Sequence, residues 1–199
     1  MNFLPIHAAP IASFIFLITL VTSLYALYVD NRVYQQFILH PYYFFRKKKY
    51  YTIITSGLVH AGLLHLILNM ITYYFAAFLL EAVFLGSVRF LLLYVLGLII
   101  SDIPSLIRYR NRPEYRSLGA SGAVSAVIFS FIALNPFQKI YLYIFPAPAW
   151  LFGVLYLIYS FFAAKNDPRP INHDAHLWGA LTGLILTWIW FPNALFSLI

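Results

Sequence analysis

The stretch "YRSLGASGAVSAV", from Tyr115 to Val127, leads from a charged loop into an apolar segment and holds a serine between two glycines. The apolar segment from Ala120 to Leu134 has 15 residues before Asn135 and a proline interrupt it. As an α-helix it would be about 22 Å long, which is shorter than the ~30 Å hydrocarbon core of a membrane. If Asn135 lies at one membrane surface, Ser121 lies below the other, in a protein-lined or wet cavity.

The whole chain has the composition of a membrane protein. It has 199 residues, of which 62% are hydrophobic and 10% charged, whereas roughly 25% charged residues are typical of soluble domains. No long alternating pattern indicates a barrel, so we predict an all-α fold with six transmembrane helices, in a single domain over residues 1–199. The expected helices lie near residues 11–28, 53–80, 88–103, 120–134, 149–164 and 175–191, with a long first loop over 29–52.

The first apolar run is expected to stay in the protein as a helix. No basic residue precedes it, and it is longer than the ~7 to 15 apolar residues of a cleavable signal segment. The first loop that follows is rich in aromatic residues ("VYQQF", "HPYYFF", "KKKYY"). Amphipathic rings settle at the boundary between lipid and water, so we expect this loop to lie in the membrane interface.

Charge and cysteine content exclude several classes of function. The chain has no cysteine, which excludes disulfides, thiolate metal sites and cysteine nucleophiles. The net charge of +7 comes mostly from "RKKKY" (46–50) and "RYRNRPEYR" (108–116). Such loops are typical of surfaces that face water or lipid headgroups. We therefore expect the lipid bilayer, and no nucleic acid, as a partner.

Ser121 has two interpretations. A position near a helix N-terminus provides unpaired backbone N–H groups and the positive end of the helix dipole, which favour an oxyanion and so suit a nucleophilic serine. The small residues around it are equally typical of a close contact between helices; they are Gly119, Ala120, Gly122 and Ala126. The stretch alone leaves both interpretations open.

His176 is the candidate base. It lies one turn before Gly179, which forms a GxxxG pair with Gly183, and such a pair lets another helix approach closely. If the partner is the helix of Ser121, the imidazole comes close to the hydroxyl, and histidine is suited to act as a base near neutral pH. The alternative is a histidine that only caps its helix.

A third group lies in "HAGLLHLILNM". His65 and Asn69 are four residues apart, hence on one helical face, and both can donate hydrogen bonds. His60 is expected near the boundary of this helix. A metal site formed by His60, His65, His173 and His176 is a weaker alternative, because the chain has no HExxH motif and no carboxylate at a supporting spacing.

Two carboxylates bear on the type of chemistry. An aspartyl protease needs two carboxylates that share a proton, and Asp102 is alone in the membrane segments. Asp174 is two residues before His176, so on a helix it would point away from the imidazole. We therefore expect a Ser121–His176 dyad with no acidic third member.

Together these motifs resemble the rhomboid family of intramembrane serine proteases. "HAGLLHLILNM" resembles the motif of the family's second helix, "GASG" (119–122) its GxSG motif, and "AHLWGALTG" (175–183) its last-helix histidine followed by GxxxG. "FPAPAWLFGVLYLIYS" (145–160) is similar to the family's approach to the fifth helix. The resemblance covers nearly all the chain and keeps the order of the motifs.

The resemblance implies a role for each of these residues. Ser121 would be the nucleophile and His176 the general base, and the oxyanion hole would consist of His65, Asn69 and the Ser121 backbone N–H. His60 and the glycines of the motifs would support them; these glycines are Gly119, Gly122, Gly179 and Gly183. The resemblance further implies single-span membrane proteins as substrates, neither metal nor organic cofactor, and a place in the bacterial inner membrane.

Two features depart from the family pattern. Ser125 stands four residues after Ser121, where family members often carry an aromatic residue beneath the base. The bacterial relatives place the nucleophile's end of the bundle away from the cytoplasm, but 11 of the 13 Lys and Arg would then lie outside, all except Arg89 and Lys139. This bias favours the reverse orientation. We keep the family orientation, because basic interfacial loops also bind anionic headgroups.

Two other functions remain as alternatives. A catalytically silent, rhomboid-like pseudoprotease would bind membrane helices without cutting them, but it would need neither Ser121 nor His176. A small transporter or channel would use the polar cavity as a path. The scarcity of membrane carboxylates and the lack of internal repeats argue against that alternative.

Overall fold

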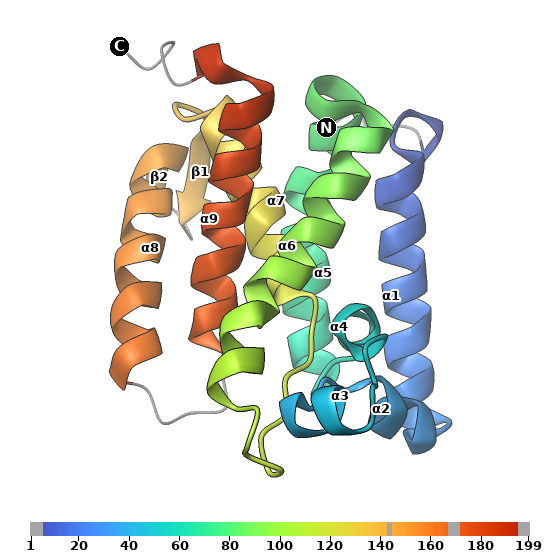
Figure 1. Ribbon diagram of the computed structural model, residues 1–199. Coiled ribbons are helices and arrows are strands. Elements are labelled where there is room, and N and C mark those ends of the chain that lie inside the picture. Colours follow the sequence, from blue (N-terminus) through green and yellow to red (C-terminus); the bar gives the residue numbers. More distant parts are fainter. Residues whose placement is uncertain (1–5, 143–144, 167–171, 195–199) are drawn as a thin grey trace.

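The computed structural model describes residues 6–142, 145–166 and 172–194. In these ranges, six helices have 14 or more residues: α1 (Pro10–Tyr28), α5 (Leu63–Leu79), α6 (Gly86–Arg108), α7 (Ser121–Leu134), α8 (Ala149–Asn166) and α9 (His173–Trp190). Figure 1 shows them as a bundle with α1 at one edge and α8 at the other. The expectation of a mostly helical protein is confirmed.

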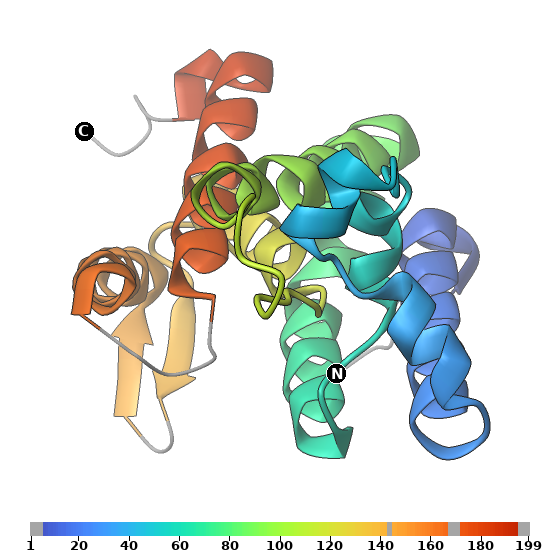
Figure 2. The same cartoon turned by 60° about the horizontal axis from the view of Figure 1, so that its bottom comes forward.

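The short helix α7 is the centre of the bundle. It packs against α5, α6, α8 and α9, and most of its side chains are buried. Figure 2 shows it between α9 and α5. A helix that is apolar all round is expected at such a position. Ser121, the first residue of α7, is partly buried where this helix begins.

Small residues let the backbones of α6 and α9 approach α7. A Cβ atom added at Gly97 of α6 would lie 2.6 Å from Ala126 Cβ and 3.3 Å from Ala123 Cα. A Cβ at Gly183 of α9 would collide with the carbonyl oxygen of Ala126. Small residues at a helix interface allow this close approach. The packing interpretation of the small residues is therefore correct for this part of α7.

Residues 53–80, which the apolar run predicts as one helix, form three pieces. A short helix α4 (Thr52–Thr55) continues as a 3-10 turn (Ser56–Leu58), residues 59–62 are not helical, and α5 follows. Gly62 has φ 174° and ψ 174°, which is extended backbone. Hydrogen bonds from His60 to distant parts of the chain replace the helical ones, and hydrophobic periodicity carries no signal for such bonds.

The connection from α5 to α6 is helical almost throughout. A π-helical segment (Leu80–Leu85) continues α5, and Gly86, with φ +68°, begins α6. This left-handed conformation suits glycine, and the chain reverses there, as Figure 1 shows. Glu81, buried in the π-helical segment, accepts the backbone N–H of Ile11 (3.1 Å) and Ala12 (2.6 Å) and so holds the start of α1. The third helix, expected over 88–103, is longer at both ends.

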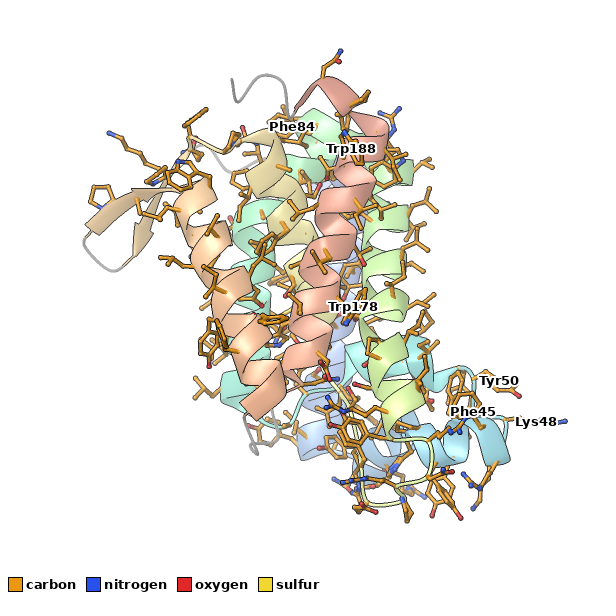
Figure 3. The ribbon with its side chains drawn as sticks, turned by 60° about the vertical axis from the view of Figure 1, so that its left-hand side comes forward. Phe45, Lys48, Tyr50, Phe84, Trp178 and Trp188 are labelled. Carbon is orange, nitrogen blue, oxygen red and sulfur yellow. The ribbon has the colours of Figure 1, made fainter. Side chains whose placement is uncertain are left out.

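The first loop is folded against the loop that precedes α7. It contains α2 (Asn31–Phe37) and α3 (Pro41–Arg46). Leu39 pairs with Ser117 as an isolated antiparallel bridge, and an Nη of Arg46 donates to the carbonyl of Arg110 at 2.9 Å. Figure 3 shows Phe45, Lys48 and Tyr50 projecting from this end, away from the bundle. The aromatic and basic side chains of the first loop thus form an outer corner of the molecule.

Two short strands precede α8. β1 (Lys139–Leu142) and β2 (Phe145–Pro148) pair antiparallel, with Lys139 opposite Pro148 and Leu142 opposite Phe145. Proline fixes its own φ and disfavours helix in the residue before it. This explains why Pro146 and Pro148 lie in extended chain and why the helix starts only afterwards.

Helix length and hydropathy alone do not identify all six expected membrane-spanning helices. Among the described residues, two helical stretches are long and apolar enough to cross a membrane, Pro10–Tyr28 and Leu63–Arg108, and the second contains both α5 and α6. The helical segments Ser121–Leu134 and Ala149–Ala163 are apolar but shorter. α9 begins with two histidines and an aspartate, which lower its hydropathy.

Candidate active site

Ser121 stands at the N-terminus of α7, two residues after a loop glycine with positive φ. Gly119 has φ +104°, a conformation that is costly for any residue with a Cβ. A Cβ there would also lie 2.8 Å from His65 Cε1 and 3.1 Å from His65 Nε2. The glycine thus lets the loop pass close to the His65 ring. Ser121 and the first N–H groups of α7, which have no partner within the helix, follow immediately.

Hydrogen bonds of His60 hold this loop in place. Its Nδ1 lies 2.8 Å from Ser23 Oγ of α1, and its Nε2 accepts the backbone N–H of Ala120 at 3.4 Å. Because Ser23 Oγ donates to the carbonyl of Leu58, it accepts from Nδ1–H, so His60 is a neutral imidazole with one donor and one acceptor. Burial, with a smaller effect of His65, lowers the pKa of His60 to about 3 and keeps it neutral. This fits the supporting role expected of His60.

His65 and Asn69 lie on one face of α5, as predicted. Asn69 Nδ2 donates to the carbonyl of His65 at 3.0 Å, and Asn69 is buried. His65 Nδ1 accepts the backbone N–H of Ala61 at 3.4 Å, so in the neutral ring Nε2 carries the hydrogen. That nitrogen is the one beside Gly119. Asn69 has a second N–H in addition to the one bound to His65.

The helices that carry Ser121 and His176 touch through their backbones. Added Cβ atoms at Gly179 and Gly122 show how close the helices are: the first would collide with the carbonyl of Gly122, and the second would lie 3.5 Å from the carbonyl oxygen of Ala175. His176 is next to Ala175, and Ser121 is next to Gly122. In the described part of the chain no hydrogen bond joins Ser121 to His176. Such bonds are often long in unliganded enzymes and tighten when substrate binds.

The start of α9 is fixed by a buried polar network. The side chain of Asn172 accepts the N–H of Ala175 (3.1 Å) and donates to Ser105 Oγ (2.9 Å) and Ser117 Oγ (3.1 Å). Ser117 Oγ in turn donates to Asp102 at 3.1 Å. These bonds join α6, the loop before Ser121 and the helix of His176. Sequence analysis did not predict this network.

Asp174 takes no part in the site. It forms a salt bridge of 3.0 Å with Arg108 of α6, which agrees with the expectation that it points away from His176. The metal alternative finds no ligand set either: within the residues that the structure describes, no three His, Asp or Glu side chains gather closely enough to hold an ion. The predicted site residues that remain are Ser121, His176, His65 and Asn69.

Residues 47–193, about three quarters of the chain, match the family described as the Rhomboid domain. The chain belongs to the rhomboid family.

Three relatives illustrate the range of this family. The rhomboid is 29% identical to "RHOMBOID-like protein 12, mitochondrial" of Arabidopsis thaliana over 76% of its own length and 51% of the relative. It is 30% identical to "Inactive rhomboid protein 1" of Drosophila melanogaster over 74% of its length and 10% of the relative. It is 29% identical to YdcA of Bacillus subtilis, provisionally named a rhomboid protease, over 71% and 67% respectively. The chain thus spans about half of the first relative and a tenth of the second.

The structure adds one residue to the site that the sequence did not indicate. Tyr156 of α8 lies with its ring nearly parallel to that of His176, with ring centroids 6.4 Å apart and an interplanar angle of 21°. Its hydroxyl is 3.0 Å from Ser125 Oγ. An aromatic ring therefore does lie beside His176 in this rhomboid, although Ser125 occupies the position where the family often carries it. No spacing in the sequence links position 156 to position 176.

Proposed function

We propose that this rhomboid is an intramembrane serine endopeptidase that cleaves transmembrane segments of membrane proteins with a Ser121–His176 dyad. The observation that carries the proposal is the backbone contact between Gly122 and Gly179. It supports the proposal because Ser121 directly precedes Gly122 at the N-terminus of α7, and His176 lies one turn before Gly179 on α9. A purely structural contact would not need a hydroxyl and an imidazole on its two sides.

In the proposed reaction, His176 takes the proton of the Ser121 hydroxyl as Oγ attacks the carbonyl carbon of the scissile peptide bond. The tetrahedral intermediate carries a negative oxygen. His176 then gives the proton to the leaving amine, and an acyl-enzyme remains on Ser121. A water molecule, deprotonated by His176, releases the second fragment and restores both residues.

The oxyanion would be stabilised by three N–H donors. The Ser121 backbone N–H is one of the unpaired amides at the start of α7. His65 contributes Nε2–H, the hydrogen left by the bond of Ala61 to Nδ1, and Asn69 contributes its second N–H. Removal of one such donor typically costs about 100- to 1,000-fold in kcat. Gly119 supports this arrangement, because any larger residue would displace the His65 ring.

We further propose that all six long helices span the membrane. Many large apolar side chains on their outer faces are exposed, for example Phe14 (60%) on α1, Phe75 (67%) on α5 and Phe162 (58%) on α8, as expected of surfaces that face lipid. The short α7 is surrounded by protein, which tolerates its irregular approach. Substrates would be single-span membrane proteins, and the compartment would be the bacterial inner membrane.

Covalent labelling of the purified protein with a fluorophosphonate probe tests the proposal. We expect labelling of the wild type and its loss, with cleavage of a model transmembrane substrate reduced at least about 1,000-fold, in Ser121→Ala and His176→Ala. The matched control is Ser13→Ala, since Ser13 lies in α1 and bonds only the carbonyl of Ala9. It should be labelled as the wild type is.

The result also decides against the main alternative. A pseudoprotease such as the name of the Drosophila relative describes would give no Ser121-dependent labelling, although it would still bind membrane helices. Equal labelling of wild type and Ser121→Ala would show that the probe reacts elsewhere. Either outcome would overturn the proposed function.

We propose that the first loop and Ser121 lie at the membrane face away from the cytoplasm. Because the chain has no cysteine, a single cysteine at Arg110, in the loop contacted by Arg46, reports its side directly. An impermeant thiol reagent should label Arg110→Cys in intact cells. Protection in intact cells with labelling after lysis would reverse the orientation.

A further inference from the structure

Tyr156 is the residue of α8 that reaches His176. Its ring is nearly parallel to the imidazole, at 6.4 Å and 21°, whereas the ring of His173 stands nearly perpendicular to His176 at 6.0 Å and 80°. The imidazole is therefore flanked by two rings. Of these two rings, only that of Tyr156 comes from a helix other than α9. It is therefore the ring contact that joins His176 to another helix.

The orientation of the Tyr156 ring is itself fixed by α7 and α8. Ser125 Oγ, one helical turn after Ser121, bonds the phenol oxygen at 3.0 Å. Phe129 of α7 packs on the ring with centroids 5.4 Å apart, and Phe152 of α8 lies at 5.9 Å. Side-chain contacts of this kind restrict a ring to one rotamer. A hydrogen bond at the phenol oxygen and ring contacts with Phe129 and Phe152 thus hold the Tyr156 side chain in place.

The distance indicates how the ring acts on His176. A cation gains most from an aromatic face within about 6 Å of the centroid, and this pair lies slightly beyond that distance. A parallel ring nevertheless limits the tilt of the imidazole, because the offset parallel arrangement is favourable only over a narrow range of angles. We expect the main effect to be on the orientation of His176.

We propose that Tyr156 is a positioning residue that orients His176 toward Ser121, and that Ser125 holds Tyr156 in place through its hydroxyl. The inference rests on the proposed function, because it assigns His176 the role of base. It means that α7 carries the nucleophile and, one turn later, the anchor of the ring that orients the base. It also makes α8, at the edge of the bundle in Figure 2, part of the catalytic arrangement.

Steady-state cleavage of a model transmembrane substrate separates this role from a structural one. Tyr156→Leu removes the ring, and we expect kcat to fall about 10- to 100-fold, as for a misplaced catalytic group, with KM within about threefold. Tyr156→Phe keeps the ring and loses only the bond to Ser125, so kcat should fall no more than about fivefold. Rescue by phenylalanine is the distinguishing result.

Ser125→Ala provides an independent test of the anchor. It removes the same hydrogen bond as Tyr156→Phe, so each variant should lower kcat by the same factor. The double variant should be no worse than either single one, since residues that act through one contact are not additive. Multiplied effects in the double variant would show that Ser125 does not act through Tyr156.

Phe162→Leu is the matched control, since Phe162 is an aromatic residue of α8 that is 58% exposed. Its kcat should equal that of the wild type. The inference is overturned if the wild type cleaves and Tyr156→Leu has the same kcat, or if Tyr156→Phe is as slow as Tyr156→Leu. A wild type that neither cleaves nor reacts with the fluorophosphonate would instead refute the proposed function, and this inference with it.

Discussion

Two of the helices that pack against α7, α8 and α9, are held to it in different ways. α9 contacts α7 through backbone: an added Cβ at Gly179 would collide with the carbonyl of Gly122. α8 contacts α7 through side chains: a Cβ at Gly153 would find Ile132 and Phe129 at an ordinary 3.5 Å. The difference shows which parts of the site are fixed. A backbone contact has no rotamers through which to adjust, whereas a side-chain contact can repack.

This difference matches the division of roles proposed above. The proposed nucleophile and base lie on the two helices joined by backbone contact, so their separation would be set by the fold. The ring that orients the base comes from α8, and its position depends on one hydrogen bond and on aromatic packing. The distance between the helices of the proposed catalytic pair is therefore fixed by backbone contact. The orientation of His176 depends on side-chain contacts.

Gly179→Ala tests the backbone contact and should have the largest effect. The new methyl group has no free space, so α9 must shift away from α7, at a cost of about 3 kcal/mol. Such a shift also separates Ser121 from His176, and cleavage should be lost. Thermal unfolding in detergent and the cleavage assay measure the two effects. A stable and active Gly179→Ala would show that the backbone contact does not position the site.

The neutral His60 makes the loop before α7 sensitive to acid. Its pKa is lowered to about 3 by burial, while in the unfolded chain it is near 6.5, so between these values the unfolded state binds more protons. Stability should therefore fall as the pH drops below about 6.5, by at most about 1.4 kcal/mol per pH unit from this residue, or about 2 kcal/mol at pH 5. Thermal unfolding in detergent as a function of pH measures this dependence.

His60→Gln is the matched variant, since the amide forms hydrogen bonds without titrating. Its unfolding temperature should depend less on pH between 6.5 and 5 than that of the wild type. An unchanged dependence would mean that other groups cause the acid sensitivity.

Two hydrogen bonds allow the two helix contacts to be compared directly. Thr187 Oγ1 of α9 and Ser130 Oγ of α7 are hydrogen-bonded at 2.6 Å, and both residues are buried. Thr187→Val should cost about 1 to 3 kcal/mol, because it leaves a buried hydroxyl unsatisfied. Tyr156→Phe at the half-buried contact of α8 should cost about 0.5 to 1.5 kcal/mol. The reverse order in thermal unfolding would contradict the distinction between the two contacts.

Gly153→Ala should have the smallest effect and is the control for Gly179→Ala. The methyl group fits against Ile132 and Phe129 at 3.5 Å, and alanine favours a helix over glycine by about 0.5 to 1 kcal/mol. We expect an unchanged or slightly higher unfolding temperature and normal cleavage. Marked destabilisation would indicate that α8 packs as tightly on α7 as α9 does.

Local patterns predicted which residues share a helical face or a helix contact better than they predicted the helix boundaries. His65 and Asn69 share a face because they are four residues apart, and Gly179 and Gly183 lie against α7 because small residues permit it. The helix expected over 53–80 is interrupted at residues 59–62. There, bonds of His60 to Ser23 and Ala120, 37 and 60 residues away, replace the local pattern on which the prediction relied.

The sequence by itself determined a helical, apolar protein, a serine at the start of a short helix, and a histidine one turn before a GxxxG face. These features depend on composition and on spacings within a few residues, which fix local structure. Only the tertiary structure decided that Tyr156 faces His176, that Ser125 anchors it, and that Asn172 joins Ser117 to the start of α9. Such contacts join residues 20 to 55 positions apart, and they arise from how whole helices pack.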